Sequence, residues 1–506
     1  MTTPPTISAP PPGPSISRRL FLSTGRVAVY QGLGLVLAFA LQTLISRVCG
    51  PAAVGVYTLF TSWLVILSVI TVPGLESCLV FFLPRLEQDQ STQRFVARTC
   101  LLLTGALSLL CGGILVAAGS TPLRWIGLPS AARLTFAFSL VFFSIGKLLD
   151  AVFLAQKDAP LVSYYNSIRV GVRILLCLPV LIYPTAAWKI IFLAIALESA
   201  LTTLLRFFRI QQRYGSFLTS ARSTVSGPSV STKMILRTSV PMLGINVIDS
   251  VSPVLDKAIM GLMLPLALIG VYRISEYVAS LNALFVGPFV AFWPFISSLH
   301  SARKLDELGA AYKNITLAIV ALMLPFSLVL FELSGFVLTL FGPAFVGQGT
   351  AVFAILAIGS IVDAIAGPAG AVLRLTDHYR LSLLINMFLL VLYCASTFLL
   401  ARAYGIVGAA IARSATLILA NIINVAANRV LLRVFPYTLK HAALLATGAG
   451  ILVVRYSLLP RNPSLTAHFV IAFVEALAFV SCAWPILRAQ VRQVPGYLKS
   501  FVSVQA

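Results

Sequence analysis

Charged side chains lie inside long apolar stretches of this chain, at spacings that place them on single faces of helices. Asp249 and Asp256 are seven residues apart, Lys257 follows directly, and Arg273 and Glu276 are three residues apart in the next apolar stretch. A charge at the middle of a bilayer costs ~2.5–3.5 kcal/mol on insertion scales, so such residues usually face a bundle interior or a water-filled cavity. The pattern predicts either ion pairs that lock neighbouring helices together or a polar pathway between them.

Two further arginines, Arg169 and Arg173, are four residues apart in the apolar stretch 162–183. If this helix enters the membrane near position 162, Arg173 lies ~17 Å along it, close to the middle of the bilayer. A guanidinium group offers paired donors that match a phosphate or pyrophosphate. Two interpretations stay open at this point. The arginines bind an anionic ligand, or they pair with Asp150 or Glu198 on neighbouring helices.

The composition indicates that these charges belong to an all-α, polytopic membrane protein. Of 506 residues, 59% are hydrophobic and only 10% are charged, and the mean hydropathy is +0.96. Soluble globular proteins do not have this composition. The net charge of +22 would suggest nucleic acid in a soluble protein, but in a membrane protein basic residues collect in cytoplasmic connections. Cysteines and histidines form no metal-site or catalytic pattern, so we expect no metal, no cofactor and no enzyme activity.

Apolar stretches recur end to end and predict about fourteen membrane spans. Of the 37 Lys and Arg residues, 24 (Arg206 among them) fall in the tails and connections of one side, seven on the other side and six within spans. Basic connections are typical of the cytoplasmic side, so we expect both termini there. The spans run approximately over 24–46, 56–83, 98–118, 131–155, 162–183, 188–208, 238–262, 269–298, 313–335, 350–373, 381–401, 405–428, 440–457 and 467–487.

The chain contains an internal repeat. Three short motifs recur at offsets of 213 to 215 residues: 55–57 at 270–272, 145–151 at 358–364, and 199–200 at 414–415. Duplicated six-helix units are common in transporters, and six spans per unit keep both copies in the same orientation. The predicted organisation is a disordered tail, an N-lobe, a basic linker, a C-lobe, and two added helices with a second tail, over 1–19, 20–208, 209–237, 238–432 and 433–506 respectively.

The repeat sets Glu198 opposite Arg413, at equivalent positions of the two lobes. The two residues either pair across the lobes or are each neutralised within their own lobe. Arg413 shares a helix face with three asparagines, at 421, 424 and 428, whose amides suit sugar hydroxyls but also hold helices together. Pro73 and Gly74 should bend or break the second span.

Several motifs in this order resemble those of bacterial polysaccharide flippases. The resemblance covers roughly 20–430. It rests on Arg47-x-x-Gly50-Pro51-x-x-x-Gly55-x-Tyr57 after the first span, on Pro73-Gly74-Leu75-Glu76 and Phe82-Leu83-Pro84-Arg85 around the end of the second, and on Asp256-Lys257, Gly270-Val271-Tyr272 and Trp293-Pro294 in the seventh and eighth. These proteins belong to the multidrug/oligosaccharidyl-lipid/polysaccharide exporter superfamily, and the chain is most similar to its O-antigen and exopolysaccharide branch.

The resemblance implies two six-helix lobes around a central cleft that opens alternately to each side of the bacterial inner membrane. It implies translocation of an undecaprenyl-pyrophosphate-linked oligosaccharide, next to partners such as a polysaccharide polymerase and glycosyltransferases. In such proteins, basic residues of the first, second and eighth helices serve the anionic headgroup, and Arg26, Arg47 and Arg273 stand at comparable places here.

Two alternatives to a flippase are open to the sequence. A cation/drug antiporter of the same superfamily would need a carboxylate in the cleft. A membrane glycosyltransferase or polymerase would need a sizeable outer domain, whereas no outer connection exceeds about 15 residues. The candidate substrate-binding residues are Arg26, Arg47, Arg169, Arg173, Arg273 and Arg413, and the candidate polar-cleft or coupling residues are Asp150, Glu198, Asp249, Asp256, Lys257, Glu276 and Asp363.

Overall fold

A computed structural model describes most of the chain, and the described part is built from helices and turns without a strand. Residues 1–15, which make up most of the predicted disordered tail, and the C-terminal residues 492–506 lie outside the described part. The described ranges are 16–86, 90–119, 127–156, 158–214, 231–285, 296, 299–300, 303–376, 378–458 and 464–491.

The N-terminal half contains six labelled helices, with short 3₁₀ turns at Leu83–Leu86, Ser130–Ala132, Leu178–Leu181 and Pro184–Ala186. They are α1 (Ile16–Thr71), α2 (Leu75–Phe82), α3 (Gln90–Ala117), α5 (Arg133–Ala155), α6 (Ala159–Cys177) and α7 (Ala187–Tyr214). α1 includes residues 16–19 of the predicted tail, and α7 continues to Tyr214, within the predicted linker.

The C-terminal half contains nine labelled helices, with 3₁₀ turns at Leu281–Phe285 and Pro343–Phe345. They are α8 (Thr232–Gly261), α9 (Leu266–Ser280), α11 (Leu305–Glu332), α12 (Ser334–Thr339), α13 (Gly347–Ala366), α14 (Ala369–Arg374), α15 (Tyr379–Leu431), α16 (Leu439–Leu458) and α17 (Leu465–Val491). The other end of the predicted linker is also helical, because α8 begins at Thr232.

The helices account for the predicted spans. In the described part, ten are long and apolar enough to cross a membrane when α8 is counted across its 43° bend. Two of these, α1 and α15, hold 56 and 53 residues, whereas ~20 residues already cross the hydrocarbon layer. Gly50 (φ 74°) and Gly405 (φ 60°) divide them, in a backbone region that favours glycine. With α1 and α15 each divided into two spans, the ten helices give twelve, and α9 and α16, which do not pass the same test, stand at the other two predicted spans.

The second span breaks where the sequence predicts it. Helix α1 ends at Thr71 and α2 begins at Leu75, so Pro73 and Gly74 lie between them. Gly74 has φ 71°, and a Cβ atom there would lie 2.2 Å from the carbonyl oxygen of Ser239 in α8. The break therefore lets the first lobe approach the second closely at this point.

The internal repeat is visible as a reciprocal contact. A Cβ atom on Gly55 would lie 1.9 Å from the carbonyl oxygen of Leu266, and one on Gly270 would lie 2.0 Å from that of Pro51. The offset of 215 residues relates Pro51 to Leu266 and Gly55 to Gly270. A contact that is repeated with its partners exchanged is the mark of a two-fold relation. The two lobes therefore pack around a pseudo-two-fold axis, and the predicted fold class is confirmed.

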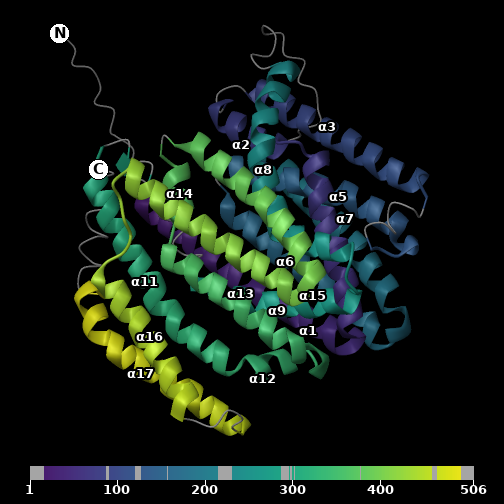
Figure 1. Ribbon diagram of the computed structural model, residues 1–506. Coiled ribbons are helices and arrows are strands. Elements are labelled where there is room, and N and C mark those ends of the chain that lie inside the picture. Colours follow the sequence, from purple (N-terminus) through teal and green to yellow (C-terminus); the bar gives the residue numbers. More distant parts are fainter. Residues whose placement is uncertain are drawn as a thin grey trace, which may run out of the picture.

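Helices α16 and α17 lie on the outside of the C-lobe, where both pack against α11 (Figure 1). The main apolar core extends over both lobes and includes Phe60, Phe192, Tyr272 and Phe353. The first turns of α1 and the last turns of α17 lie at the same end of the bundle (Figure 1). We call this the terminal end, and the opposite one, which holds the Gly55 and Gly270 contacts, the far end.

Candidate functional site

Arg173 of α6 and Glu198 of α7 form the centre of a charge cluster in the N-lobe. Arg173 donates from Nε to Glu198 Oε2 at 3.1 Å and from Nη1 to the hydroxyl of Tyr57 in α1 at 2.7 Å. Arg169, one helical turn earlier, lies 3.9 Å from Glu198 Oε1 through its Nε. The carboxylate of Glu198 is fully buried, whereas 34% of the Arg169 side chain is exposed. Of the two interpretations left open by the sequence, the structure shows the ion pairs of these arginines with Glu198.

Two more ion pairs continue this cluster towards the terminal end. Arg206 of α7 lies 2.8 Å from Asp150 of α5, and Lys147 lies 3.2 Å from Glu76 of α2. Lys147 also donates to Ser250 in α8 of the other lobe, at 3.2 Å. The N-lobe charges therefore form an extended series along α5, α6 and α7.

The C-lobe holds a compact cluster of five charges from three spans. Lys257 lies 2.9 Å from Asp256 and 2.7 Å from Glu276. Arg413 of α15 bridges the same two carboxylates at 2.9 and 2.6 Å, and Arg273 lies 2.8 Å from the second oxygen of Glu276. This group joins α8, α9 and α15, because each carboxylate accepts from cations on more than one helix.

The most exposed charge in each cluster is an arginine, although Arg206 and Lys257 are as buried as the carboxylates. The side chains of Arg169, Arg273 and Arg413 are 34%, 31% and 29% exposed, whereas Glu198 and Asp256 are 0% exposed. A partly exposed charge within a span faces a wet cavity rather than lipid, because lipid exposure is costly. The exposed part of the C-lobe cluster is therefore positive, whereas the N-lobe series exposes Asp150 as well as Arg169.

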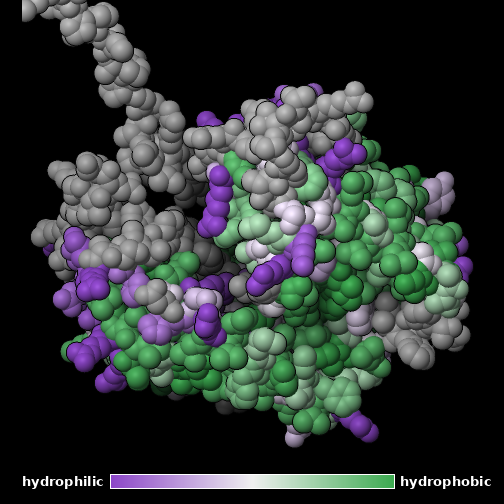
Figure 2. Space-filling view, turned by 90° about the horizontal axis from the view of Figure 1, so that it is seen from above, coloured by the Kyte–Doolittle hydropathy of each residue, from purple (hydrophilic) through white to green (hydrophobic). Residues whose placement is uncertain are grey.

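A cavity of about 570 Å³ lies between the lobes towards the terminal end. Glu76, Lys147 and Asp150 of the N-lobe line it, and Met242 of α8 closes it from the C-lobe. Figure 2, seen from above in the orientation of Figure 1, shows hydrophilic side chains near the middle of this face, with apolar surface beside them. At the far end, backbone contacts at Gly55 and Gly270 hold the lobes together. The structure is thus closed at the far end.

Glu198 and Arg413 do not pair with each other. Each is neutralised within its own lobe, which is one of the two alternatives that the sequence leaves open. The asparagines beside Arg413 act between helices: Asn421 donates to Asp363 Oδ1 at 2.9 Å, and Asn428 donates to the carbonyl oxygen of Ala369 at 2.9 Å.

The stripe that contains Asp249 and Asp256 turns towards the C-lobe's own helices. Asp256 is fully buried in the five-charge cluster. Asp249 is half exposed and lies 3.4 Å from Arg374 of α14. Of these two acids, only Asp249 is accessible from outside the protein interior.

Arg26 and Arg47 lie outside both clusters. Arg47, at the end of the first span, donates to the carbonyl oxygens of Leu340 and Thr339 at 2.7 and 3.0 Å. It therefore caps the C-terminus of α12 in the other lobe, at the far end. Arg26 is exposed near the start of α1.

Sequence reasoning missed three members of the clusters, Tyr57, Tyr272 and Arg206. Tyr272 donates to Asp256 Oδ2 at 2.5 Å, and it is the repeat equivalent of Tyr57, which accepts from Arg173. Arg206 is only 2% exposed, although the count of basic residues on each side includes it with the connections; it lies within the predicted span 188–208. The repeat could have revealed it, because the offset of 215 relates Arg206 to Asn421 in the middle of a span. Among the described residues, no group of His, Cys, Asp and Glu could hold a metal ion.

Comparisons with known proteins give structural neighbours only. No protein-family model and no curated protein sequence matches the chain. The lipid II flippase MurJ, in an inward closed conformation, superimposes with a TM-score of 0.66 at 16% identity, over 92% of this chain and 99% of MurJ. An inward-facing multidrug resistance MATE family transporter of the MOP superfamily gives 0.64 at 15% identity, over 80% and 98%.

A third similar structure is a MOP superfamily transporter from Pyrococcus furiosus, described as having a binding pocket of reverse polarity. It gives a TM-score of 0.56 at 16% identity, over 82% of this chain and 96% of that one. At such low identity these similarities establish the fold alone. The chain has the fold of the multidrug/oligosaccharidyl-lipid/polysaccharide transporters that the sequence resembles.

Proposed function

We propose that the protein translocates an undecaprenyl-pyrophosphate-linked oligosaccharide across the bacterial inner membrane by alternating access, with both termini in the cytoplasm. The observation that carries this proposal is the polarity of the two clusters. Each contains three cations and two carboxylates when Arg206 and Asp150 are counted with the N-lobe group. Each therefore has one positive charge in excess, and its most exposed member is an arginine. An anionic headgroup fits such a surface.

The excess cations are Arg169 in the N-lobe and Arg273 in the C-lobe. Glu198 retains Arg173 when Arg169 is removed, and Glu276 retains Lys257 and Arg413 when Arg273 is removed. Both side chains are about one-third exposed. We infer that these two arginines bind the pyrophosphate, whereas Arg173 and Arg413 mainly neutralise buried carboxylates.

The arrangement of the two ends supports alternating access. The cavity near the terminal end, where Glu76, Lys147 and Asp150 stand among apolar side chains, would admit the sugars, whereas Arg169 and Arg273 lie outside its lining. The lipid tail would stay in the bilayer beside the lobes. Opening of the far end would require separation of the contacts at Gly55 and Gly270 and of the Arg47 cap on α12.

The proposal is tested by transfer of a labelled polyprenyl-pyrophosphate disaccharide across proteoliposomes that contain the full chain. Arg169→Gln and Arg273→Gln should each slow transfer about tenfold or more, since a charge-assisted hydrogen bond contributes ~1.5–3 kcal/mol. Arg380→Gln is the matched control, because Arg380 is exposed and, within the described residues, its side chain bonds only to that of its neighbour Tyr379. Normal transfer by both cleft variants would contradict the proposal.

A cation/drug antiporter remains a second candidate because of Asp363. In the described part of the chain its carboxylate accepts from the neutral amide of Asn421, whereas its repeat equivalent Asp150 pairs with Arg206. A carboxylate without a cationic partner could take up a cation or proton. Asp363→Asn should then abolish cation-coupled drug efflux from proteoliposomes, while a flippase should keep its transfer rate in this variant.

A further inference from the structure

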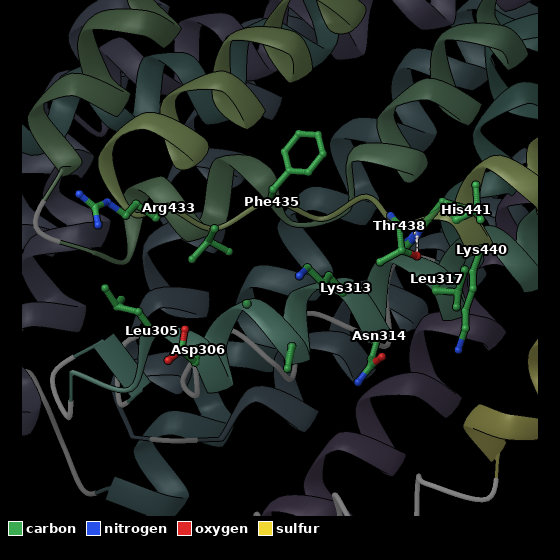
Figure 3. A pocket seen from close by; sticks show the side chains of 14 residues that line it. Leu305, Asp306, Lys313, Asn314, Leu317, Arg433, Phe435, Thr438, Lys440 and His441 are labelled. Atoms are coloured by element: carbon green, nitrogen blue, oxygen red, sulfur yellow. Dashed lines mark hydrogen bonds between the residues drawn. The ribbon is translucent and has the colours of Figure 1, made fainter.

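We propose that a pocket between α11 and the start of α16 binds the phosphate headgroup of an anionic membrane lipid. This inference does not depend on the proposed transport function. The pocket has a volume of about 530 Å³ and shares no lining residue with either charge cluster. Figure 3 shows α11 on one side and the chain that joins α15 to α16 on the other. Its polar lining consists mainly of Asp306, Lys313, Arg433, Thr438, Lys440 and His441.

The charge of the pocket favours an anion. Three cations, Lys313, Arg433 and Lys440, face a single acid, Asp306. Within the part of the chain that the structure describes, these three cations have neither an ion pair nor a hydrogen bond to another side chain. The arginines and lysines of the lobe clusters differ in this respect, since each has a carboxylate partner. The cations of the pocket are therefore available to a ligand.

Arg433 is held in the pocket wall by an unusual backbone conformation. Its φ of 56° lies in the left-handed region, where a glycine commonly follows the end of a helix. The N–H groups of Leu432 and Val434 on either side both donate to the carbonyl oxygen of Asn428, at 3.1 and 3.3 Å. A strained residue of this kind is frequent at functional sites. The chain thus places a cation where the backbone alone would prefer glycine.

A buried donor without an acceptor also lies in the pocket wall. His441 is 2% exposed, and its Nδ1 accepts from the backbone N–H of Thr438 at 3.2 Å. Since Nδ1 accepts, the proton of a neutral imidazole lies on Nε2. Nε2 is buried and has no hydrogen-bond partner in the described part of the chain. The residue stands in the first turn of α16, where the helix dipole is positive. The dipole at this end of α16 favours a bound anion.

The surroundings favour a lipid over a soluble phosphate. Leu305 and Leu439 at the rim are 37% and 86% exposed, so apolar surface adjoins the cations. Helix α11 has 28 residues and is therefore ~42 Å long, more than the ~30 Å of the hydrocarbon layer. Lys313 lies ~12 Å from its start and opens the predicted span 313–335, so we expect it near the lipid headgroups. Basic pockets between membrane helices bind anionic headgroups in this way.

Native mass spectrometry of the full chain in detergent tests the proposal, with phosphatidylglycerol as the probe and phosphatidylcholine as its neutral counterpart. The variants are Lys313→Gln, Lys440→Gln and Arg433→Gly, since glycine removes the cation and suits the positive φ. Each should weaken phosphatidylglycerol retention about fivefold, as expected for a basic residue at an anionic surface. Arg380→Gln should retain the lipid as the wild type does.

Three results would overturn the lipid assignment. The first is that a triple variant, which combines these three substitutions, retains phosphatidylglycerol as the wild type does. The second is equal retention of phosphatidylcholine by the wild type. The third is complete displacement of phosphatidylglycerol by millimolar glycerol 3-phosphate or inorganic phosphate, which would identify a soluble phosphate as the ligand. Unchanged melting temperatures of the single variants exclude a loss of fold, and the single variants carry the test if the triple variant unfolds.

Discussion

The two lobes share a scaffold but distribute their charges differently. Asp150 and Asp363 are equivalent in the repeat, and so are the residues that they contact, Arg206 and Asn421. The same position thus holds an ion pair in one lobe and an amide contact in the other. The contact between these two helix positions is therefore the same in both lobes, while the charges of the residues that make it differ.

A second difference concerns the shape of the clusters. The C-lobe gathers five charges around Asp256 and Glu276, so one substitution affects the whole group. The N-lobe spreads its ion pairs along α5 to α7, so each carboxylate depends mainly on one or two cations. The C-lobe should therefore be the more sensitive to loss of a single carboxylate.

The largest expected effect is that of Glu276→Ala. This change leaves Lys257, Arg273 and Arg413 with Asp256 alone, and breaking a buried ion pair costs ~3–5 kcal/mol. Glu198→Ala affects fewer cations and should lower the melting temperature less. Thermal unfolding of both variants in detergent, followed by tryptophan fluorescence, measures the difference. Equal losses would remove the distinction between a compact and an extended cluster.

Next in size is the contrast between Asp150→Asn and Asp363→Asn, the same substitution at equivalent positions. Asp150→Asn leaves the buried guanidinium of Arg206 without its carboxylate and should cost about 3 kcal/mol. Asp363→Asn weakens one amide contact and should cost about 1 kcal/mol. Denaturant unfolding of the two variants side by side checks the order, and a reversed order would contradict the assigned partners.

A smaller, symmetric effect is expected at the two close-contact glycines. Gly55→Ala and Gly270→Ala each push a methyl group into a backbone carbonyl, and overpacking of this kind costs ~1–3 kcal/mol. The two losses should be similar because the contacts are equivalent in the repeat. Gly105→Ala is the control, since nothing lies within 4 Å of its added Cβ atom. Tolerance of only one of the two glycine variants would break the proposed two-fold relation.

The smallest expected effect is that of Arg47→Ala. It removes two hydrogen bonds to α12, each contributing ~0.5–1.5 kcal/mol. We expect the far end to open more often, while the C-lobe keeps its stability. Labelling of the native Cys49 thiol with a water-soluble maleimide, in a chain without the other cysteines, should become faster. An unchanged labelling rate would mean that the cap does not hold the lobes together.

Much of the fold follows from the sequence. The apolar stretches gave fourteen spans, and the Pro73 and Gly74 break was expected because proline cannot donate to a helix. The repeat motif at Gly55 and Gly270 anticipated the symmetric contact, although only the structure shows that each glycine meets the other lobe's backbone.

The site was harder to predict than the fold, for physical reasons. Pairing of Arg173 with Glu198 was one of two open interpretations, because helix periodicity gives a face but not its neighbour. The position of Arg206 was misassigned, since counting charges cannot separate a buried cation near a helix end from one in a connection. The role of Arg47 depends on backbone carbonyl groups of α12, which carry no sequence signal.

The most direct test of the central claim is headgroup selectivity. Transfer of a polyprenyl-pyrophosphate disaccharide should be compared with that of the same disaccharide on a neutral polyprenyl carrier, in proteoliposomes of the wild type and of the Arg169→Gln, Arg273→Gln double variant. We predict that the wild type strongly prefers the pyrophosphate carrier and that the double variant, at an unchanged melting temperature, loses this preference. Equal preference for the pyrophosphate carrier in both proteins would show that Arg169 and Arg273 do not bind the pyrophosphate headgroup selectively. This result would contradict the proposed function.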